Sequence, residues 1–392
     1  MTLLCAPVKK LRKTDKVDLL ELDKQLYQQE KRYLLRIADY HNYEETPDLE
    51  TILSSLKRAH PHVDVYKIAT LARSTLDSLR MLEFLQKNPN LIGLCMGEYG
   101  AITRILAPIF GVPIMYAPLE EDEKNAPGQL LASELCEIYH FRRLNRSTKI
   151  YGLIGDPVFR SIGHLFHNDY FRSHEKNAVY VKMVVKPEEL PEFIERAKRL
   201  PFGGLSVTAP LKEAIIPLID EVDPKAKFIG AVNTLAFRNG KIWGTNTDIE
   251  IPLEIFGSIE GKTVVILGAG GAAKAVIYAA MRKGAKVIIV NRTLSKAHHL
   301  ADYFGCNWSD KMPNYDLLVN TTSVSMPIAP EEILPGKPVM DIALYDTEFL
   351  KEARKRGCPA VDGFPMYFKQ ALAQQIFWRR SSNTKHPILE QV

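Results

Sequence analysis

The chain has 392 residues, of which 25% are charged and 46% hydrophobic, and its formal net charge is +5. This length is typical of two or three domains, and so small a charge without a basic block excludes the usual nucleic-acid-binding classes. The five cysteines lie far apart without a C-x-x-C pair, which favours reduced thiols over disulfides or a metal site. No apolar run reaches membrane-spanning length, and the start has no signal-peptide pattern. We therefore expect a cytoplasmic protein that binds small molecules and no nucleic acid, membrane or metal; its oligomeric state stays open.

Residues 1–147 form a first segment in which short β-like runs alternate with helix-like runs. The β-like runs are Asp18–Leu22, Leu34–Tyr40, Val63–Ala69, Leu91–Met96 and Ile114–Ala117. This alternation is typical of a parallel α/β layer or of part of a (β/α)8 barrel. Because a complete barrel needs about 200 to 250 residues, we expect an incomplete one. Either the sequence begins downstream of the true start or the barrel is degenerate, and Met1–Lys9 could be the remnant of an early strand.

Four short motifs in this segment carry residues suited to carbonyl chemistry. They are Asp39-Tyr-His41-Asn-Tyr, Val65-Tyr-Lys67-Ile-Ala, Cys95-Met-Gly97 with Thr103-Arg104, and Ala126-Pro-Gly-Gln129. Burial in a strand lowers the pKa of a lysine, so its free amine can attack a carbonyl, and a neutral histidine can accept a proton. Each residue also has a plainer interpretation, since Lys67 could pair with a carboxylate and His41 could cap a turn.

Together these motifs resemble type I 3-dehydroquinate dehydratase, a (β/α)8 barrel enzyme that needs no metal. The resemblance implies that Lys67 forms a Schiff base with the substrate ketone and that His41 is the general acid/base. It also implies that Arg104 and Gln129 hold the carboxylate and a hydroxyl of the substrate. The acidic and arginine residues of the family's opening strands have no convincing counterpart here, and Asn125 stands where serine is usual.

A second α/β segment covers residues 148–252 and is completed by a helix within 363–380. A linker, Leu144-Asn-Arg-Ser-Thr, precedes it. The expected strands are Ile150–Ile154, Ala178–Val185, Gly204–Val207 and Val232–Phe237. Polar motifs follow several of these runs, as expected for the strand ends of a binding site.

Residues 253–362 are predicted to form a dinucleotide-binding Rossmann domain. An apolar run enters the turn Gly268-Ala-Gly270-Gly271-Ala272, a helix-like run follows, and a second apolar run comes one βαβ unit later. Gly268 permits a tight turn, Gly270 lets the backbone approach a pyrophosphate, and the helix N-terminus attracts it. The second run ends in Asn291-Arg292-Thr293, with Lys296 one turn on, and these cations suit the 2′-phosphate of NADP. The plainer alternative is a glycine-rich turn that binds no nucleotide.

Six motifs in order resemble shikimate dehydrogenase over about Ile150 to Trp378. They are Gly155-Asp-Pro-Val with Ser161, Leu205-Ser206-Val-Thr208-Ala-Pro-Leu-Lys212, Gly230-Ala-Val-Asn233, Asn246-Thr-Asp248, the glycine-rich turn, and Asp341 with Tyr345 followed by Gly363-Phe-Pro-Met366 with Gln370. The resemblance implies that Lys212 and Asp248 are the catalytic pair, which suits a ketone reduction because the developing alkoxide needs a proton donor. It assigns substrate binding to Ser161, Ser206, Thr208, Asn233, Tyr345 and Gln370. Taken singly, Lys212 would be a surface lysine and Asn233 a turn residue.

Two positions depart from that family's pattern. Gly163 stands where a second serine is usual and is followed by His164 in place of proline. Ile249 follows Asp248 where glycine is usual. One carboxylate contact could therefore be lost, and the wall near the nicotinamide could change.

Both resemblances on one chain look like the fused dehydratase–dehydrogenase of plants and some bacteria. We therefore predict a shikimate-pathway enzyme that reduces 3-dehydroshikimate with NADPH and could also dehydrate 3-dehydroquinate. The alternatives are a monofunctional shikimate or quinate dehydrogenase with an inactive barrel remnant, and a non-catalytic NADP-binding regulator. Residues 381–392 are expected to be a polar tail.

Overall fold

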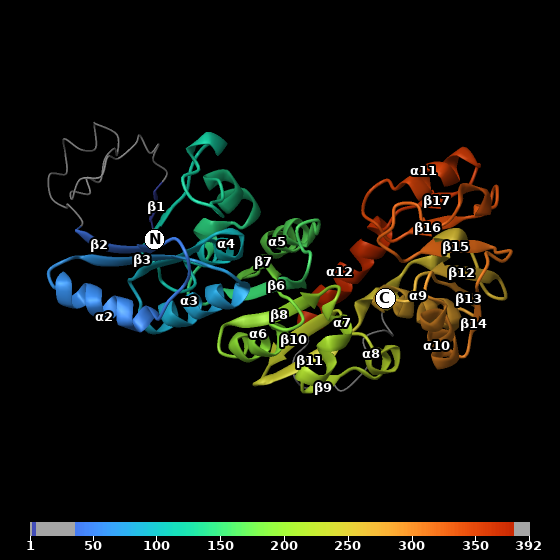
Figure 1. The fold of residues 1–392 in the computed structure, drawn as a ribbon, viewed down its shortest axis with the longest axis horizontal. Helices are drawn as coiled ribbons and strands as arrows, with labels where there is room; N and C mark the ends of the chain where they lie inside the picture. The colour runs from blue at the N-terminus through green and yellow to red at the C-terminus, as the bar shows by residue number, and fades with distance from the viewer. Residues whose placement is uncertain (1, 5–35, 380–392) are drawn as a thin grey trace. The chain divides into compact units, whose positions relative to one another are not determined.

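The computed structural model describes residues 2–4 and 36–379, in two compact units that divide the chain between Leu211 and Lys212 (Figure 1). The first unit contains an N-terminal lobe, residues 36–146, and a middle lobe, residues 149–211. Each unit is an arrangement of strands joined by helices, so the predicted α/β class is confirmed. Within the described ranges, every helix is too short or too polar to cross a membrane.

The N-terminal lobe is built on a parallel sheet with the order β2-β3-β4. Its strands and main helices are β2 (Ile37–Asn42), α2 (Leu49–Ala59), β3 (Val65–Leu71), α3 (Thr75–Lys87), β4 (Ile92–Met96), α4 (Ala101–Ile105) and β5 (Ile114–Tyr116). Figure 1 shows α2 and α3 along one side of this sheet. β5 pairs in parallel with β1 (Thr2–Leu4), inside the stretch expected to be an early strand. The expected strand Asp18–Leu22 lies outside the described residues, so the extent of the barrel stays a prediction.

The middle lobe is a second parallel arrangement with the order β7-β6-β8. Its elements are β6 (Lys149–Gly155), α5 (Gly163–Ser173), β7 (Ala178–Val184), α6 (Leu190–Ala197) and β8 (Phe202–Val207). The central strand β6 is buried along most of its length because helices and neighbouring strands cover it. Polar residues that follow β6 and β8 therefore emerge at the carboxyl ends of adjacent parallel strands.

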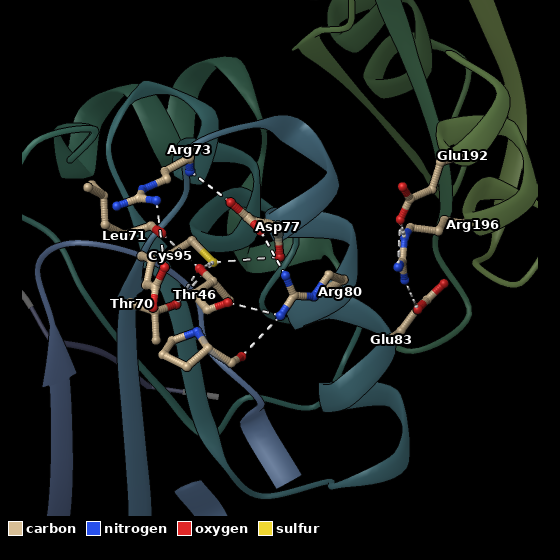
Figure 2. Close-up of polar contacts among 12 residues, drawn as sticks. Thr46, Thr70, Leu71, Arg73, Asp77, Arg80, Glu83, Cys95, Glu192 and Arg196 are labelled. Atoms are coloured by element: carbon tan, nitrogen blue, oxygen red, sulfur yellow. Dashed lines mark hydrogen bonds and ion pairs between the residues drawn. The ribbon is translucent and has the colours of Figure 1, made fainter. Parts of the chain in front are cut away.

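Side chains join the two lobes of the first unit. α3 packs against α6, and Arg196 on α6 donates to Glu83 on α3 with 2.7 Å between Nη1 and Oε2. Figure 2 shows Arg196 between Glu83 and Glu192, its partner on the same helix. The hydroxyl of Thr75 also donates to the carbonyl of Val184. Because Glu83 and Arg196 are only 17% and 19% exposed, the ion pair is partly shielded from water and links the lobes.

The second unit begins with short elements that carry polar residues. They are α7 (Leu211–Ala214), η5 (Ile216–Leu218), β9 (Glu221–Val222), α8 (Pro224–Ile229), β10 (Thr234–Arg238), β11 (Lys241–Thr245), η6 (Thr247–Glu250) and η7 (Leu253–Phe256). β10 and β11 form an antiparallel hairpin, and β9 runs parallel to β11. The last helix, α12 (Phe364–Arg379), returns to this hairpin, where Trp378 donates from Nε1 to the carbonyl of Leu235 at 2.8 Å.

A six-stranded parallel sheet forms the rest of the second unit. The elements are β12 (Thr263–Leu267), α9 (Gly271–Arg282), β13 (Lys286–Val290), α10 (Leu294–Phe304), β14 (Asn307–Ser309), β15 (Leu317–Asn320), η8 (Pro330–Glu332), β16 (Val339–Asp341), α11 (Glu348–Lys355) and β17 (Ala360–Val361). The strand order is β14-β13-β12-β15-β16-β17. The chain runs outward from β12 to β14 and then returns to place β15 on the other side of β12, so the switch point lies between β12 and β15. Alternate residues of β12 fill the cores on opposite faces of the sheet. This is the predicted Rossmann arrangement, and its switch point lies at the glycine-rich turn.

Candidate active sites

Lys212 and Asp248 form an ion pair in the second unit. Lys212 lies on α7 and Asp248 on η6, and 2.5 Å separate Nζ from Oδ2. The two side chains are 17% and 9% exposed, so the pair is shielded from most solvent. Asn246 fixes the local backbone, because its side-chain oxygen accepts from the Asp248 amide at 3.0 Å and its amide donates to the carbonyl of Ala231. The arrangement places an amine that can donate a proton beside a carboxylate.

A network of polar side chains lies next to this pair. Asn233 donates from Nδ2 to the Thr247 hydroxyl at 3.1 Å, and the Thr247 amide donates back to Asn233 Oδ1 at 2.8 Å. The Thr247 hydroxyl is also 3.4 Å from Gln370 Oε1 on α12. The structure thus brings Asn233 and Gln370 together through Thr247. Tyr345 is 46% exposed and makes no hydrogen bond to this network within the described residues.

Thr247 is a residue to which the sequence prediction assigned no role. The signal was present, because Thr247 lies inside the Asn-Thr-Asp motif that ends in Asp248. A threonine in such a place is usually a turn residue, so its hydroxyl has no obvious role until the partners are seen. Its bonds to Asn233 and its contact with Gln370 show that it orients two side chains from different elements.

The glycine-rich turn opens next to Lys212. Gly268 has a φ of +112°, a conformation in which a side chain would be strained, and an added Cβ would lie 2.7 Å from Thr321 Oγ1. A Cβ at Gly270 would meet nothing within 4 Å, so the space over the turn is open. A Cβ at Gly271, the first residue of α9, would lie 3.4 Å from Lys212 Cδ. The residues therefore fit a pyrophosphate at the start of α9, with Lys212 beside it; Ala272 follows on the first turn.

The end of β13 presents cationic side chains to solvent. Asn291 Nδ2 donates to the carbonyl of Thr293, which is the N-cap residue of α10. Arg292 and Lys296 are exposed, and neither forms an ion pair with another described residue. Two unpaired cations at this strand end fit a phosphate on the 2′ position of a ribose better than they fit a bare hydroxyl.

Ser161, Ser206 and Thr208 lie in the middle lobe of the first unit. Ser206 is 5% exposed, and its hydroxyl accepts from Tyr180 Oη at 2.8 Å. Ser161 Oγ accepts from the Gly163 amide at 3.1 Å. Thr208 follows β8, and its amide donates to the carbonyl of Ile154 at 2.9 Å. All three therefore lie near the carboxyl ends of β6 and β8.

The two unusual residues after Ser161 have structural roles in the middle lobe. A Cβ at Gly163 would lie 3.2 Å from Ser161 Oγ and 3.3 Å from the Tyr180 ring, so a larger residue would need these groups to shift. The His164 ring stacks on Tyr139 of the N-terminal lobe at 6.2 Å. Burial, helped by the Lys182 charge, lowers the pKa of His164 to about 4. His164 is therefore a neutral ring at the contact between the lobes.

His41 and Lys67 lie on adjacent strands of the N-terminal lobe. Burial lowers the pKa of Lys67, and the nearby Arg104 charge acts in the same direction, while Asp39 opposes both. Burial and the Lys67 charge also lower the pKa of His41. Lys67 Nζ lies 5.6 Å from the ring centre of Tyr116 on β5. The sheet thus places an amine with a lowered pKa close to a neutral imidazole.

Arg104 and Gln129 lie on loops and short helices that follow β4 and β5. Arg104 is 4% exposed, burial lowers its pKa to about 10, and its Nε has no partner among the described residues. A buried guanidinium with an unused donor is suited to an anion such as a carboxylate. Gln129 Oε1 accepts from the Asn125 amide at 2.8 Å, which closes its own loop and leaves its amide group as a donor.

Three family models match successive parts of the chain. Residues 11–146 match Type I 3-dehydroquinase. Residues 153–235 match the Shikimate dehydrogenase substrate binding domain, and residues 250–335 match Shikimate / quinate 5-dehydrogenase. Both expected families are therefore found, in the expected order.

Relatives that match most of the chain decide the family. The Shikimate biosynthesis protein AroDE of Chlamydia pneumoniae is 35% identical over 358 residues, which cover 87% of this chain and 73% of that protein. The chain belongs to this family of fused 3-dehydroquinase and shikimate dehydrogenase proteins. The Bifunctional 3-dehydroquinate dehydratase/shikimate dehydrogenase, chloroplastic, of Arabidopsis thaliana is 38% identical over 377 residues, 86% of this chain. The chain spans 62% of the length of that plant relative.

A solved structure resembles the part of the chain that follows the N-terminal lobe. It is the shikimate 5-dehydrogenase from Thermus thermophilus in complex with NADP(H) and shikimate, with a TM-score of 0.56 and 31% identity. The match covers 59% of this chain and 94% of that one. The fold predicted for this part is thereby confirmed.

Proposed function

We propose that this chain reduces 3-dehydroshikimate to shikimate with NADPH. The observation that carries the proposal is the 2.5 Å ion pair between Lys212 and Asp248 beside Gly271, the first residue of the nucleotide-binding helix. The Thermus thermophilus structure with NADP(H) and shikimate supports the cofactor and the substrate. Arg292 and Lys296, with Asn291 and Thr293, would hold the 2′-phosphate, while the turn from Gly268 to Ala272 would hold the pyrophosphate.

The residues of the chain would act on the substrate as follows. When bound, NADPH supplies the hydride that reduces the ketone carbon. Lys212 donates a proton to the carbonyl oxygen as it becomes an alkoxide, and Asp248 holds the amine in place. Asn233, Gln370 and the hydroxyl-bearing side chains Ser161, Ser206, Thr208 and Tyr345 bind the hydroxyl and carboxylate groups. A substrate that lacked these groups would leave buried donors unpaired, which gives the site its specificity.

The reverse reaction tests this proposal directly. Purified protein with shikimate and NADP⁺ should produce an absorbance rise at 340 nm. Parallel assays with quinate and with NAD⁺ distinguish the related dehydrogenases, because both should be slower. Binding of NADP⁺ without any turnover of shikimate or quinate would instead favour a non-catalytic regulator.

We also propose that the N-terminal lobe dehydrates 3-dehydroquinate to 3-dehydroshikimate. The Lys67 amine adds to the ketone carbon and water leaves, which forms an iminium ion. His41 takes a proton from the adjacent carbon, and the β-hydroxyl then leaves with a proton returned by His41. Arg104 and Gln129 hold the substrate, and a water molecule hydrolyses the iminium to free Lys67. The lowered pKa values of Lys67 and His41 support these roles, because both groups must be neutral at the start.

Trapping of the iminium tests this second activity. Sodium borohydride added with 3-dehydroquinate should reduce the imine and attach the substrate carbon skeleton to Lys67, as mapped by mass spectrometry of peptides. An unmodified Lys67 in a protein that still oxidises shikimate would mean that the lobe does not catalyse the dehydration.

The proposal also includes the boundaries of the domains. Residues 1–147 would form the dehydratase part, 148–252 with 363–380 the shikimate-binding domain, and 253–362 the NADP-binding domain. Residues 381–392 would be a tail. The substrates and the cofactor are small metabolites, which suits a protein that works in the cytoplasm without a membrane or nucleic-acid partner.

A further inference from the structure

Asp39 is one of the charged groups that act on Lys67, although the sequence prediction assigned it no role. It lies two residues before His41 on β2, so both side chains are on the same face of the strand. Asp39 Oδ2 is 3.1 Å from His41 Nδ1, so the carboxylate charge lies directly beside this ring nitrogen. In the parallel register Asp39 is directly opposite Lys67 on β3. One carboxylate thus contacts the proposed base and faces the proposed nucleophile.

The groups around this carboxylate come from several described elements. The charge of Asp39 acts on Lys67 of β3 and on Tyr116 of β5, and the Tyr43 ring stacks on His41 at 5.8 Å. Arg104 of α4 acts on Lys67 with the opposite sign. In the part of the chain that the structure describes, Asp39 is the carboxylate whose charge acts on His41, Lys67 and Tyr116. It is therefore the counter-charge of a cluster that otherwise contains cations and neutral rings.

The charge of Asp39 beside Nδ1 favours one of the two imidazole nitrogens of His41 as the base. A carboxylate oxygen this close to Nδ1 attracts a proton there and repels a lone pair, so the charge of Asp39 favours the tautomer with the proton on Nδ1. The lone pair of a neutral His41 is then on Nε2, the nitrogen that points away from the carboxylate. Without an acceptor at Nδ1, a neutral imidazole exchanges between two tautomers, and only one of them presents the base in this direction.

We propose that Asp39 is a positioning residue that holds His41 as the Nδ1–H tautomer, so that Nε2 is the free base toward the substrate on Lys67. This inference rests on the proposed dehydratase function for its consequence, but the tautomer itself is a property of the free protein. Asp39 and His41 side chains are 40% and 31% exposed, so the pair adds little to stability, and its loss should leave the fold intact.

The test compares Asp39→Asn with Asp64→Asn, a matched variant of another partly exposed aspartate in the same lobe that bonds Arg36. Full-length protein with ¹⁵N-labelled histidine is studied by long-range ¹H–¹⁵N NMR, and a His41→Gln sample assigns the His41 signals. In the parent protein and in Asp64→Asn, the shifts should show Nδ1–H. In Asp39→Asn the His41 shifts should move toward the average of the two tautomers, and its pKa should fall further because an opposing charge has been removed.

Dehydration kinetics then link the tautomer to the reaction. Asp39→Asn should lower kcat for 3-dehydroquinate about tenfold or more while KM changes less than threefold, and Asp39→Glu should recover part of kcat. A His41 that is already Nε2–H in the parent protein, or that keeps its tautomer and kcat in Asp39→Asn, would overturn the inference. If no variant or parent protein dehydrates the substrate, the dehydratase proposal fails, whereas the NMR result still decides the role of Asp39.

Discussion

Lys67 and Lys212 each lie near an aspartate, yet the surroundings of the two amines differ. Lys212 Nζ contacts Asp248 at 2.5 Å in a shielded ion pair. Lys67 is opposite Asp39 on the neighbouring strand, and its Nζ lies 5.6 Å from the centre of the Tyr116 ring, while burial and the Arg104 charge lower its pKa. A proton donor must carry the proton that it gives, whereas an amine that attacks a carbonyl must be neutral. The position of the aspartate relative to the amine therefore distinguishes a lysine that donates a proton, Lys212, from a lysine that attacks a carbonyl, Lys67.

Among the changes that test this comparison, neutralising Asp248 should have the largest effect on activity. Asp248→Asn keeps the shape but removes the charge that holds Lys212, so kcat for shikimate oxidation should fall about 10³-fold. Stopped-flow or steady-state absorbance at 340 nm measures the change. Asp310→Asn, which alters an exposed aspartate of the same unit, should keep the parent rate. A loss below threefold in Asp248→Asn would show that Lys212 works without its partner.

Removal of the positive charge at Arg292 should change the preference between NADP⁺ and NAD⁺. It should not change the surroundings of Lys67 or Lys212. Arg292→Ala should raise KM for NADP⁺ about tenfold, since a charge-assisted bond to the 2′-phosphate is lost, and should leave KM for NAD⁺ unchanged. Arg282→Ala, an exposed arginine at the end of α9, is the matched control. Equal effects on the two cofactors would contradict the assignment of Arg292.

The pH dependence of trapping should reveal the environment of Lys67. Burial favours the neutral amine, so the pKa in the folded protein lies below 10.5, and reactivity should persist as the pH falls below that value. Borohydride trapping with 3-dehydroquinate across a pH series should give half-maximal labelling of Lys67 below pH 10.5. A midpoint at or above the ordinary lysine value would remove the contrast between the two amines.

The smallest effect concerns the attachment of the N-terminal lobe to the middle lobe. Glu83→Gln removes the charge that meets Arg196 between α3 and α6, and the first calorimetric transition should lose about 1–2 kcal/mol. Glu192→Gln is a matched control, because Glu192 bonds the same arginine from within α6 and is 54% exposed. It should cost less than about 0.5 kcal/mol. Equal losses would mean that the lobes do not depend on this ion pair (Figure 2).

Regular periodicity made the Rossmann sheet predictable from sequence. The apolar run that enters the glycine-rich turn was expected as a strand and is β12 (Thr263–Leu267), because four successive apolar residues between turn signals are typical of a buried strand. The strand expected at Leu34–Tyr40 was found at Ile37–Asn42, since apolar pattern alone does not fix where the pairing of β2 with β3 begins.

The residues of the candidate sites could be predicted only where they belong to a recognisable sequence motif. Lys212 and Asp248 are 36 residues apart, and only their motifs linked them before the 2.5 Å contact was seen. Asp39 and Thr247 were missed because an aspartate on a strand and a threonine in a turn are common, and their roles depend on partners from other elements. Tyr345, which the motif also predicted, makes no bond to the Asn233 network in the described residues and stays a prediction.

A crossed comparison of two lysine variants tests the central claim most directly. The Lys67→Met and Lys212→Met proteins are purified separately, and each preparation is assayed both for dehydration of 3-dehydroquinate and for oxidation of shikimate. The account predicts that Lys67→Met loses only the dehydration and that Lys212→Met loses only the oxidation, each by at least about 10²-fold. Shikimate oxidation that survives in Lys212→Met within threefold of the parent rate, or that disappears in Lys67→Met, would contradict it.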